Sequence, residues 1–265
     1  MTDRPAATPA VVITGASDGI GRALAQQFAD PAKTFVLLGR DQPRLDSLAA
    51  ELQQQPGLRA LTLSLDLTDS DAPAKLDALL ERENLWIETL INSAGIGQSG
   101  PFAGSNPADI DNLVALNVAA LTRLTRRALG DMRARKRGSI INLSSLGAYA
   151  PGPYQAAYYA SKAYVLSLSE ALSHELKTEH IHVLAVVPGP VRTNFHARMG
   201  TLGAWYLKLM PIPTPETVAR HTHLAHRLKL RMVAPGLSAA LLIPAMKVLP
   251  HRLLLPLVGF LLRPR

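Results

Sequence analysis

Short apolar runs alternate with longer amphipathic stretches along most of the chain. The apolar runs are nearly continuous in valine, isoleucine and leucine, which is typical of strands that helices cover on both faces of a sheet. Strands are expected at residues 10–14, 34–38, 61–65, 89–92, 139–143 and 181–187. The amphipathic stretches predict helices at residues 20–29, 44–54, 72–83, 107–129 and 155–179.

This alternation of strand and helix predicts the fold class. It indicates an α/β protein with a single Rossmann-type domain, in which helices flank a doubly wound parallel β-sheet. Right-handed crossovers would bring the carboxyl ends of the strands to one edge of the sheet, where a ligand cleft is expected. No repeat, low-complexity tract or linker divides the chain.

The composition is that of an ordinary globular protein and excludes several classes. Hydrophobic residues make up 48% and charged residues 18% of the 265 residues, so the chain is not of the disordered type. The absence of cysteine excludes a disulfide scaffold, a zinc–thiolate site and a cysteine nucleophile. Because neither a secretory signal nor a long apolar run is evident, we expect a cytoplasmic protein without a transmembrane helix.

The net charge of +8 is concentrated in the last quarter of the chain. From Asn194 onward the only acidic residue is Glu216, against ten lysines and arginines. Such a basic surface favours phosphates, nucleic acid or anionic lipid. No zinc-finger spacing, aromatic RNA-binding motif or basic helix accompanies it, so we expect no nucleic-acid binding.

A glycine-rich turn follows the first predicted strand and opens the first predicted helix. It reads Thr14-Gly15-Ala16-Ser17-Asp18-Gly19-Ile20-Gly21. The glycines permit a tight turn and a close approach of the backbone to a pyrophosphate, which then lies at the helix N-terminus. The turn therefore predicts a dinucleotide site that includes Gly15, Ser17, Asp18, Gly19, Ile20 and Gly21.

The end of the second predicted strand indicates which dinucleotide is bound. In NAD-binding domains a carboxylate about 20 residues beyond the glycines accepts hydrogen bonds from the ribose. Gly39 and Arg40 stand there instead. A guanidinium pairs well with a 2′-phosphate, and the Ser17 hydroxyl could also donate to it, so NADP is favoured over NAD. The alternative is a solvated arginine ahead of a helix that Asp41 caps.

Tyr158 and Lys162 lie four residues apart and so share one face of the predicted helix at 155–179. A lysine ammonium beside the phenol, together with the cationic ring of an oxidised nicotinamide, favours the phenolate and would bring the tyrosine pKa down toward the working pH. Tyr158 could then exchange a proton with a carbonyl or alcohol oxygen. Such pairs are common on solvated helices, but Ser145 follows the strand at 139–143 and is expected at the same edge, where it could hold the substrate oxygen.

These residues carry a resemblance to the short-chain dehydrogenase/reductase family from about Val11 to Thr193. The matching motifs, in chain order, are TGASDGIG at 14–21, Asp66-Leu67, NSAG at 92–95, Asn117, Ser145, YYASK at 158–162 and PGPVRT at 188–193. The family usually has a second asparagine where this chain has Ser93, and we expect that departure to loosen a structural hydrogen bond rather than abolish activity.

The resemblance implies roles for the matched residues. Tyr158 would be the general acid/base, Ser145 would position the substrate carbonyl, Asn117 would anchor a water in a proton relay, and Lys162 would also hold the nicotinamide ribose. Asp66 would contact the adenine, Asn92 the adenosine ribose, and Val191 and Thr193 the nicotinamide end. The other predicted cofactor contacts are Leu67, Ala94, Gly95, Pro188 and Gly189. His174, His180 and His182 lack converging carboxylates, so no metal site is expected.

The regular alternation ends after Pro188. Residues 1–9 are expected to form an N-terminal tail, 10–193 the dinucleotide-binding and catalytic core, 194–235 a substrate lid region of the same domain, and 236–265 an apolar, basic C-terminal tail. Apolar lid residues such as Trp205 and Tyr206 indicate an apolar or amphipathic substrate, or simply pack the lid against the sheet.

The tail has three explanations: it closes the domain's own core, contacts another subunit, or lies on an anionic membrane surface. The first two are favoured over peripheral membrane contact, since members of the resembling family commonly form homodimers or homotetramers.

The sequence therefore predicts an NADP(H)-dependent oxidoreductase that interconverts a ketone or aldehyde and an alcohol, with Tyr158 as general acid/base. One alternative is a catalytically silent dinucleotide-binding sensor or partner-binding protein. Another is an enzyme of the same fold that acts as an enoyl reductase or an epimerase.

Overall fold

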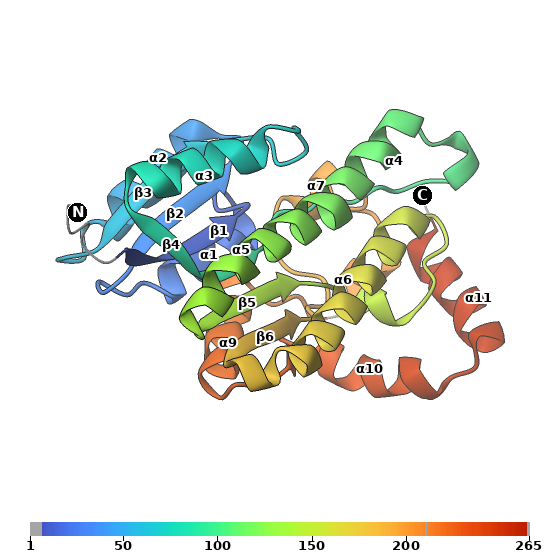
Figure 1. The fold of residues 1–265 in the computed structure, drawn as a ribbon. Coiled ribbons are helices and arrows are strands. Elements are labelled where there is room, and N and C mark those ends of the chain that lie inside the picture. The colour runs from blue at the N-terminus through green and yellow to red at the C-terminus, as the bar shows by residue number, and fades with distance from the viewer. Residues whose placement is uncertain (1–6, 210, 264–265) are drawn as a thin grey trace, which may run out of the picture.

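A computed structural model describes residues 7–209 and 211–263 of the chain. Within these residues, seven parallel strands form one sheet in the order β3–β2–β1–β4–β5–β6–β7 (Figure 1). The strands are β1 Thr8–Thr14, β2 Thr34–Gly39, β3 Arg59–Ser64, β4 Leu85–Asn92, β5 Gly138–Leu143, β6 Ile181–Val186 and β7 Met232–Val233. The predicted fold class is confirmed.

Helices cover both faces of this sheet. They are α1 Gly19–Gln27, α2 Gln42–Leu52, α3 Ala72–Arg82, α4 Pro107–Val114, α5 Leu121–Arg135, α6 Ala156–Glu175, α7 Phe195–Arg198, α8 Trp205–Leu209, α9 Pro215–Arg227, α10 Leu237–Val248 and α11 His251–Leu262. Short helical turns are η1 Phe102–Gly104, η2 Ala115–Ala120, η3 Leu146–Tyr149 and η4 Lys177–Glu179.

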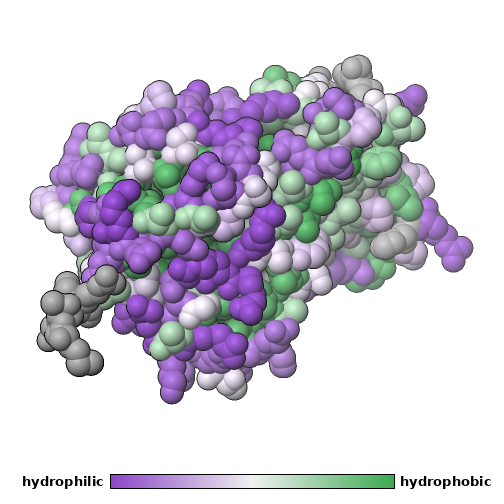
Figure 2. Space-filling view, turned by 45° about the horizontal axis from the view of Figure 1, so that its top comes forward, coloured by the Kyte–Doolittle hydropathy of each residue, from purple (hydrophilic) through white to green (hydrophobic). Residues whose placement is uncertain are grey.

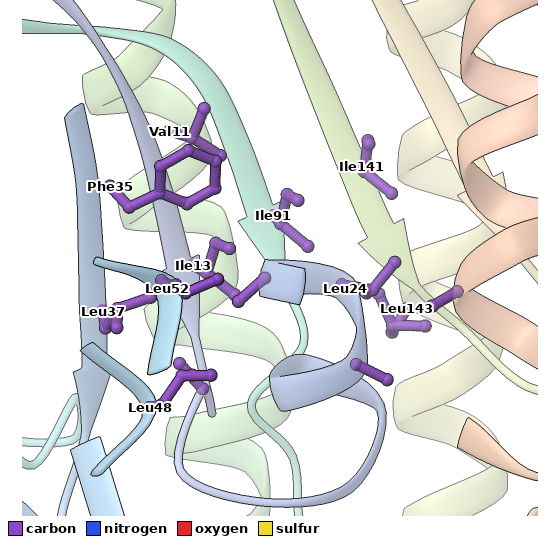
Figure 3. Packing of buried hydrophobic residues seen from close by; sticks show 14 of the residues in the cluster. Val11, Ile13, Leu24, Phe35, Leu37, Leu48, Leu52, Ile91, Ile141 and Leu143 are labelled. Carbon is purple, nitrogen blue, oxygen red and sulfur yellow. The ribbon is translucent and has the colours of Figure 1, made fainter. Parts of the chain in front are cut away.

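Alternate residues of each strand build two separate cores. Val11 and Ile13 of β1 point to the face that α1, α2 and α9 cover, where they pack with Phe35 and Leu37 of β2 (Figure 3). Val12, between them, points to the opposite face, which α3 and α5 cover. Because successive side chains of a strand alternate between faces, a continuous apolar run fills both cores.

The strand register aligns the turns that carry the predicted motifs. Thr14 pairs with Leu38 of β2 and with Asn92 of β4, and Asn92 pairs with Asn142 of β5. The glycine-rich turn, the turn after β2 and the segments after β4 and β5 therefore leave the sheet at one edge. This edge is where the sequence places the ligand cleft.

The region beyond Pro188 differs from the expected lid. Within residues 194–235, α7 and α8 lie at the sheet edge, whereas α9 packs against α1 and buries Val218 and Ala219 in the first core. β7 extends the sheet beside β6, with Ala185 paired to Met232. A strand of two residues is too short to show a hydrophobic period, so the sequence pattern did not predict it.

Several boundaries differ from prediction, among them the start of β4 at Leu85, four residues earlier than expected. β1 begins at Thr8, two residues earlier than expected, because Thr8 pairs with Leu85 of β4. The helix predicted at 107–129 is interrupted by the π-helical turn η2 and continues to Arg135.

The C-terminal tail forms two short helices, α10 and α11, at the end of the molecule opposite β3 (Figure 1). Leu254, Val258 and Leu262 of α11 pack with Ala150 and Tyr206 in a small hydrophobic cluster. The inner side of the tail thus closes the domain's own core, the first of its three explanations. No helix in the described ranges is long and apolar enough to cross a membrane.

Candidate active site

A cavity of about 680 Å³ lies at the carboxyl edge of the sheet. Nearly all of the predicted site residues line it: Gly15, Ser17, Asp18, Gly19, Ile20, Gly21, Arg40, Asp66, Leu67, Ala94, Gly95, Ser145, Tyr158, Lys162, Pro188, Gly189, Val191 and Thr193. Residues from distant parts of the sequence are brought together because β1, β2, β4, β5 and β6 all end here. Asn92 and Asn117 are not part of its lining.

The glycine-rich turn has no space for side chains at its glycines. Gly15 and Gly19 have positive φ angles of 66° and 55°. A Cβ on Gly21 would lie 2.2 Å from the Gly15 carbonyl oxygen. Asp18 caps α1, since its Oδ1 accepts a hydrogen bond from the Gly19 N–H at 2.8 Å. The turn and the N-terminus of α1 thus line the cavity closely, which fits the phosphates of a dinucleotide.

Two arginines and a serine lie beside the end of β2. A Cβ on Gly39 would come within 3.2 Å of the Ser17 Oγ, so this hydroxyl lies against the strand end. Arg40 Nη1 is 3.7 Å from Asp66 Oδ2, and Arg44 Nη1 is 3.6 Å from Asp18 Oδ2. Two guanidinium groups and a hydroxyl at one place fit a 2′-phosphate.

Arg44 was missed in the sequence. It follows Arg40 by one helical turn, so a second basic residue in the first turn of α2 was the available signal. Asp66 lies in the turn after β3, beside Arg40. Its Oδ1 accepts hydrogen bonds from the Thr68 N–H and hydroxyl at 2.9 and 2.8 Å. The Thr68 backbone hydrogen bond and the Arg40 charge lower the pKa of Asp66, so it stays ionised beside the guanidinium.

Ser145, Tyr158 and Lys162 meet in the inner part of the cavity. Ser145 begins η3 directly after β5, and its Oγ accepts a hydrogen bond from the Gly147 N–H at 3.1 Å. Lys162 lies one turn beyond Tyr158 in α6, with its Nζ 5.8 Å from the centre of the tyrosine ring. That Nζ donates to the Leu143 carbonyl oxygen at 2.8 Å, which anchors the ammonium to the end of β5.

The electrostatics of this group differ from the sequence-based prediction. Burial raises the pKa of Tyr158 to about 12, although the Ser145 hydroxyl lowers it in part. Burial also lowers the pKa of Lys162 to about 8. In the protein without a bound nicotinamide, Lys162 does not offset this effect of burial, because desolvation penalises both charged forms. Tyr158 is protonated at neutral pH and so has the proton that a carbonyl oxygen would accept.

Asn117 has a structural position rather than one in the cavity wall. It lies in η2, where its Oδ1 accepts from the Ile96 N–H at 2.9 Å and its Nδ2 donates to the Ile96 carbonyl at 2.8 Å. The same Nδ2 also donates to the Ser161 Oγ at 3.1 Å. The side chain thus joins the segment after β4 to α6, and the role of Asn117 toward a relay water stays a prediction.

Asn92 is likewise turned away from the cavity. Its Nδ2 donates to the Asn142 Oδ1 at 2.8 Å and to the Thr125 Oγ1 at 3.1 Å. This network ties β4 to β5 and α5 inside the protein. The Asn92 side chain thus points into the protein, while its neighbours Ala94 and Gly95 line the cavity. The cofactor contacts of these three residues stay predictions.

The outer part of the cavity is apolar and includes the C-terminal tail. Phe195 and Met199 line it beside Tyr158, whose ring centre is 5.5 Å from that of Phe195. The tail contributes Leu242, Met246, Leu254, Leu257, Val258, Leu261 and Leu262. No local pattern in the sequence could assign these residues to the site, because the tail reaches it through packing on distant elements such as α8 and η3.

A few polar groups interrupt this apolar wall. Gln155 is 2% exposed and lines the cavity, and its Nε2 has no acceptor at hydrogen-bond geometry among the described residues. Burial raises the pKa of the nearby Tyr206 hydroxyl, and the Gln155 side chain lies close enough to lower that pKa in part. The Tyr206 hydroxyl lies 3.3 Å from the His196 Nδ1. Gln155 therefore offers a donor to a ligand oxygen in an otherwise apolar compartment. No group of His, Asp and Glu side chains in the described residues could hold a metal ion.

Comparison with known proteins identifies relatives of this fold and site. A short-chain dehydrogenase of Sphingobium yanoikuyae in complex with NADPH is 35% identical, with a TM-score of 0.80 over 90% of this chain and 92% of that one. A bulky-bulky ketone specific alcohol dehydrogenase of Comamonas testosteroni is 34% identical, with a TM-score of 0.75 and 86% of each chain covered.

Sequence comparison identifies further relatives over part of the chain. The very-long-chain 3-oxoacyl-CoA reductase of Bos taurus is 32% identical over 69% of this chain and 59% of its own length. The chain spans about 60% of the length of the first such relatives it matches. The family pattern described as short chain dehydrogenase matches residues 9–201, which covers the sheet edge and the Ser145, Tyr158 and Lys162 group. On this evidence the chain belongs to the short-chain dehydrogenase family.

Proposed function

We propose that this protein is an NADP(H)-dependent oxidoreductase that interconverts a ketone or aldehyde and the corresponding alcohol. The observation that carries the proposal is the meeting of Ser145, Tyr158 and Lys162 in one part of a cavity whose other parts hold a phosphate-binding turn and an apolar wall. Such an arrangement places a proton donor between a dinucleotide site and a space for an organic substrate.

The residues divide the work of carbonyl reduction among them. A dinucleotide held along the glycine-rich turn would supply, when bound, a hydride for the carbonyl carbon. Ser145 holds the carbonyl oxygen beside Tyr158, whose hydroxyl donates its proton to that oxygen as negative charge develops on it. The ammonium of Lys162 stabilises the phenolate that is left. In alcohol oxidation the same proton returns from the substrate hydroxyl to Tyr158.

The preference for NADP rests on the charge at the end of β2. Arg40, Arg44 and Ser17 line the same cavity, and an arginine rather than a carboxylate stands directly after Gly39. The neighbour from Sphingobium yanoikuyae, which has NADPH bound, supports the same choice.

The substrate class follows from the wall opposite Tyr158. Aliphatic side chains of α10 and α11 surround the outer cavity, while Gln155 offers a hydrogen-bond donor. These groups favour an apolar or amphipathic carbonyl compound that carries a further oxygen. The relatives named for very-long-chain 3-oxoacyl-CoA and bulky ketones support this class. We further propose a cytoplasmic homodimer or homotetramer.

The test is oxidation of NADPH and NADH in the presence of ketones and aldehydes graded by chain length. Tyr158→Phe should lower kcat about a thousandfold, because the proton donor is lost, while NADPH binding persists. Tyr164→Phe, which removes a partly exposed hydroxyl from the same helix, is the matched control and should keep wild-type turnover. Dinucleotide binding by the wild-type protein without turnover of any carbonyl or alcohol would instead identify a silent binding protein.

A further inference from the structure

The outer side of α10 and α11 is an apolar surface that nothing in the described chain covers. We call it the tail face: Leu241, Val248, Leu249, Leu253, Leu257 and Phe260, which are 66%, 82%, 36%, 59%, 53% and 60% exposed. Figure 2 shows hydrophobic residues gathered toward this end of the molecule and mostly hydrophilic residues at the other. Contiguous exposed apolar side chains of this size mark a docking surface.

The tail face is held in place by packing on its inner side. Leu254, Val258 and Leu262 are buried against Tyr206 and neighbouring residues, so α11 cannot turn its outer leucines inward. Phe260 stacks on Trp205 of α8, with ring centres 6.4 Å apart and planes inclined by 19°. The exposed side chains are therefore presented by a packed scaffold.

The wall between the tail face and the cavity is one helix thick. Leu253 lies on the tail face, whereas the next residue, Leu254, lines the cavity, and Leu257 belongs to both surfaces. An occupant of the tail face would thus lie directly outside the apolar part of the substrate cavity.

The charge around the tail face selects its occupant. Lys247, Arg252 and Arg263 are exposed in the same segment as these leucines, and no acidic residue occurs after Glu216. A second copy of the chain docked on the tail face by a twofold axis would bring these like charges together, which opposes self-association through this face. Anionic lipid headgroups complement them, while the leucines enter the boundary of the acyl chains.

The length of the helices agrees with a surface-lying mode. α10 and α11 have 12 residues each and contain Pro244 and Pro256. A helix of this length extends about 18 Å, short of the roughly 30 Å hydrocarbon core of a bilayer. An apolar face with basic residues at its edge is typical of helices that lie in the interface.

We propose that the tail face docks onto an anionic lipid bilayer and that the cavity receives its substrate, an apolar carbonyl compound dissolved in that bilayer, through the α10–α11 wall. Docking needs no catalysis. Delivery of the substrate rests on the function proposed above.

Flotation of the full chain with vesicles tests the docking. The probe is vesicles of equal parts phosphatidylglycerol and phosphatidylcholine, compared with pure phosphatidylcholine. Wild-type protein should float with the anionic vesicles, and high salt should weaken this binding. The combined variant Leu241→Ser, Val248→Ser, Leu253→Ser should bind at least about tenfold more weakly, since it removes exposed apolar area without touching the cavity lining.

Two further variants make the flotation test specific. Leu224→Ser with Leu228→Ser removes exposed leucines from the α9 region and should bind as the wild type does. Arg252→Glu with Arg263→Glu should lose binding to anionic vesicles. The docking is overturned if wild-type protein stays unbound at low ionic strength, or if the triple variant floats equally well. The docking proposal is also overturned by the following pair of results: light scattering shows that the triple variant converts a dimer to monomers, and the wild-type dimer does not float with vesicles.

Activity assays separate delivery from docking. With a short water-soluble ketone, the triple variant should turn over at the wild-type rate. With a long-chain ketone carried in anionic vesicles, its rate should fall at least about fivefold, in step with its weaker binding. Equal rates on the vesicle-borne ketone would overturn delivery. Vesicle binding by a wild-type protein that reduces neither ketone would leave docking intact and reject the proposed function.

Discussion

At the scale of single residues, burial decides the chemistry of the site. Tyr158 and Lys162 have the spacing that brings a phenol and an ammonium to one helix face, yet both are removed from water. Burial raises the pKa of Tyr158 and lowers that of Lys162, so the neutral form of each side chain is favoured. Tyr158 is therefore protonated at neutral pH, and Lys162 loses its charge near pH 8. This makes the lysine the group that titrates in the working range.

The pH dependence of carbonyl reduction should reveal this lysine. Lys162 is charged below its pKa of about 8 and neutral above it, so kcat/KM for reduction should fall as the pH rises through about 8. The reason is that a neutral amine no longer stabilises the phenolate left by proton transfer. In Lys162→Arg, which stays charged, the remaining activity should lack this decline. Lys177→Arg, at an exposed position, is the control. If kcat/KM of Lys162→Arg still declined near pH 8, the decline would have to be assigned to another group.

Cofactor choice should depend on Arg40. Arg40→Asp removes a guanidinium and introduces a carboxylate next to Asp66, so the affinity for NADPH should fall about thirtyfold or more. The affinity for NADH should change little, because it lacks the 2′-phosphate. Fluorescence titration of both dinucleotides measures the two values. Arg82→Asp, at a distant ion pair with Glu83, is the control, and an equal loss for both dinucleotides would reject the phosphate contact.

At the scale of elements, α9 and β7 show how the region after Pro188 is joined to the sheet. His226 of α9 lies 2.9 Å from the Ser139 Oγ of β5 through its Nε2, and the Phe28 ring packs against His226 and His223. Burial, followed by the nearby His182 and Lys229, lowers the pKa of His226 to about 3. The element is thus packed around a neutral imidazole.

This neutral histidine makes the fold sensitive to acid. The folded pKa of about 3 lies below the unfolded value of 6.5, so the unfolded state binds the proton first and stability is lost as pH falls below 6.5. Between pH 7 and 5 the free energy of unfolding should drop by about 2 kcal/mol from this group.

Urea unfolding at the two pH values measures this effect. His226→Gln should remove most of the difference, whereas His174→Gln, at an exposed position, should leave it unchanged. A wild-type free energy of unfolding that does not change between pH 7 and 5 would contradict the depressed pKa.

At the scale of the whole molecule, the tail completes the substrate cavity. Leu254 is 3% exposed and lines the cavity from α11, although its position lies far from the motifs in the sequence. The same helix carries part of the tail face on its outer side, so one element links the substrate space to the molecular surface.

Truncation of this wall should change substrate preference. Leu254→Ala should raise KM for a long-chain ketone about tenfold, because the chain loses apolar contact, while KM for a short ketone stays close to the wild-type value. Leu241→Ala, on the outer side of α10, is the matched control. Steady-state kinetics with both ketones measures the two KM values. An equal rise in KM for both ketones would indicate that the substitution disturbs the fold rather than the cavity wall.

The sequence by itself determined the sheet, the glycine-rich turn and the Ser145, Tyr158 and Lys162 group. These follow from local properties: the period of apolar residues, the φ angles that glycine permits and the four-residue spacing of a helix face. The tertiary structure alone decided that Asn92 and Asn117 face inward, that β7 and α9 join the sheet layers, and that the tail forms a cavity wall. It also set the direction in which the Tyr158 pKa moves. Each of these depends on which distant segments exclude water from a side chain, and no local pattern contains that information.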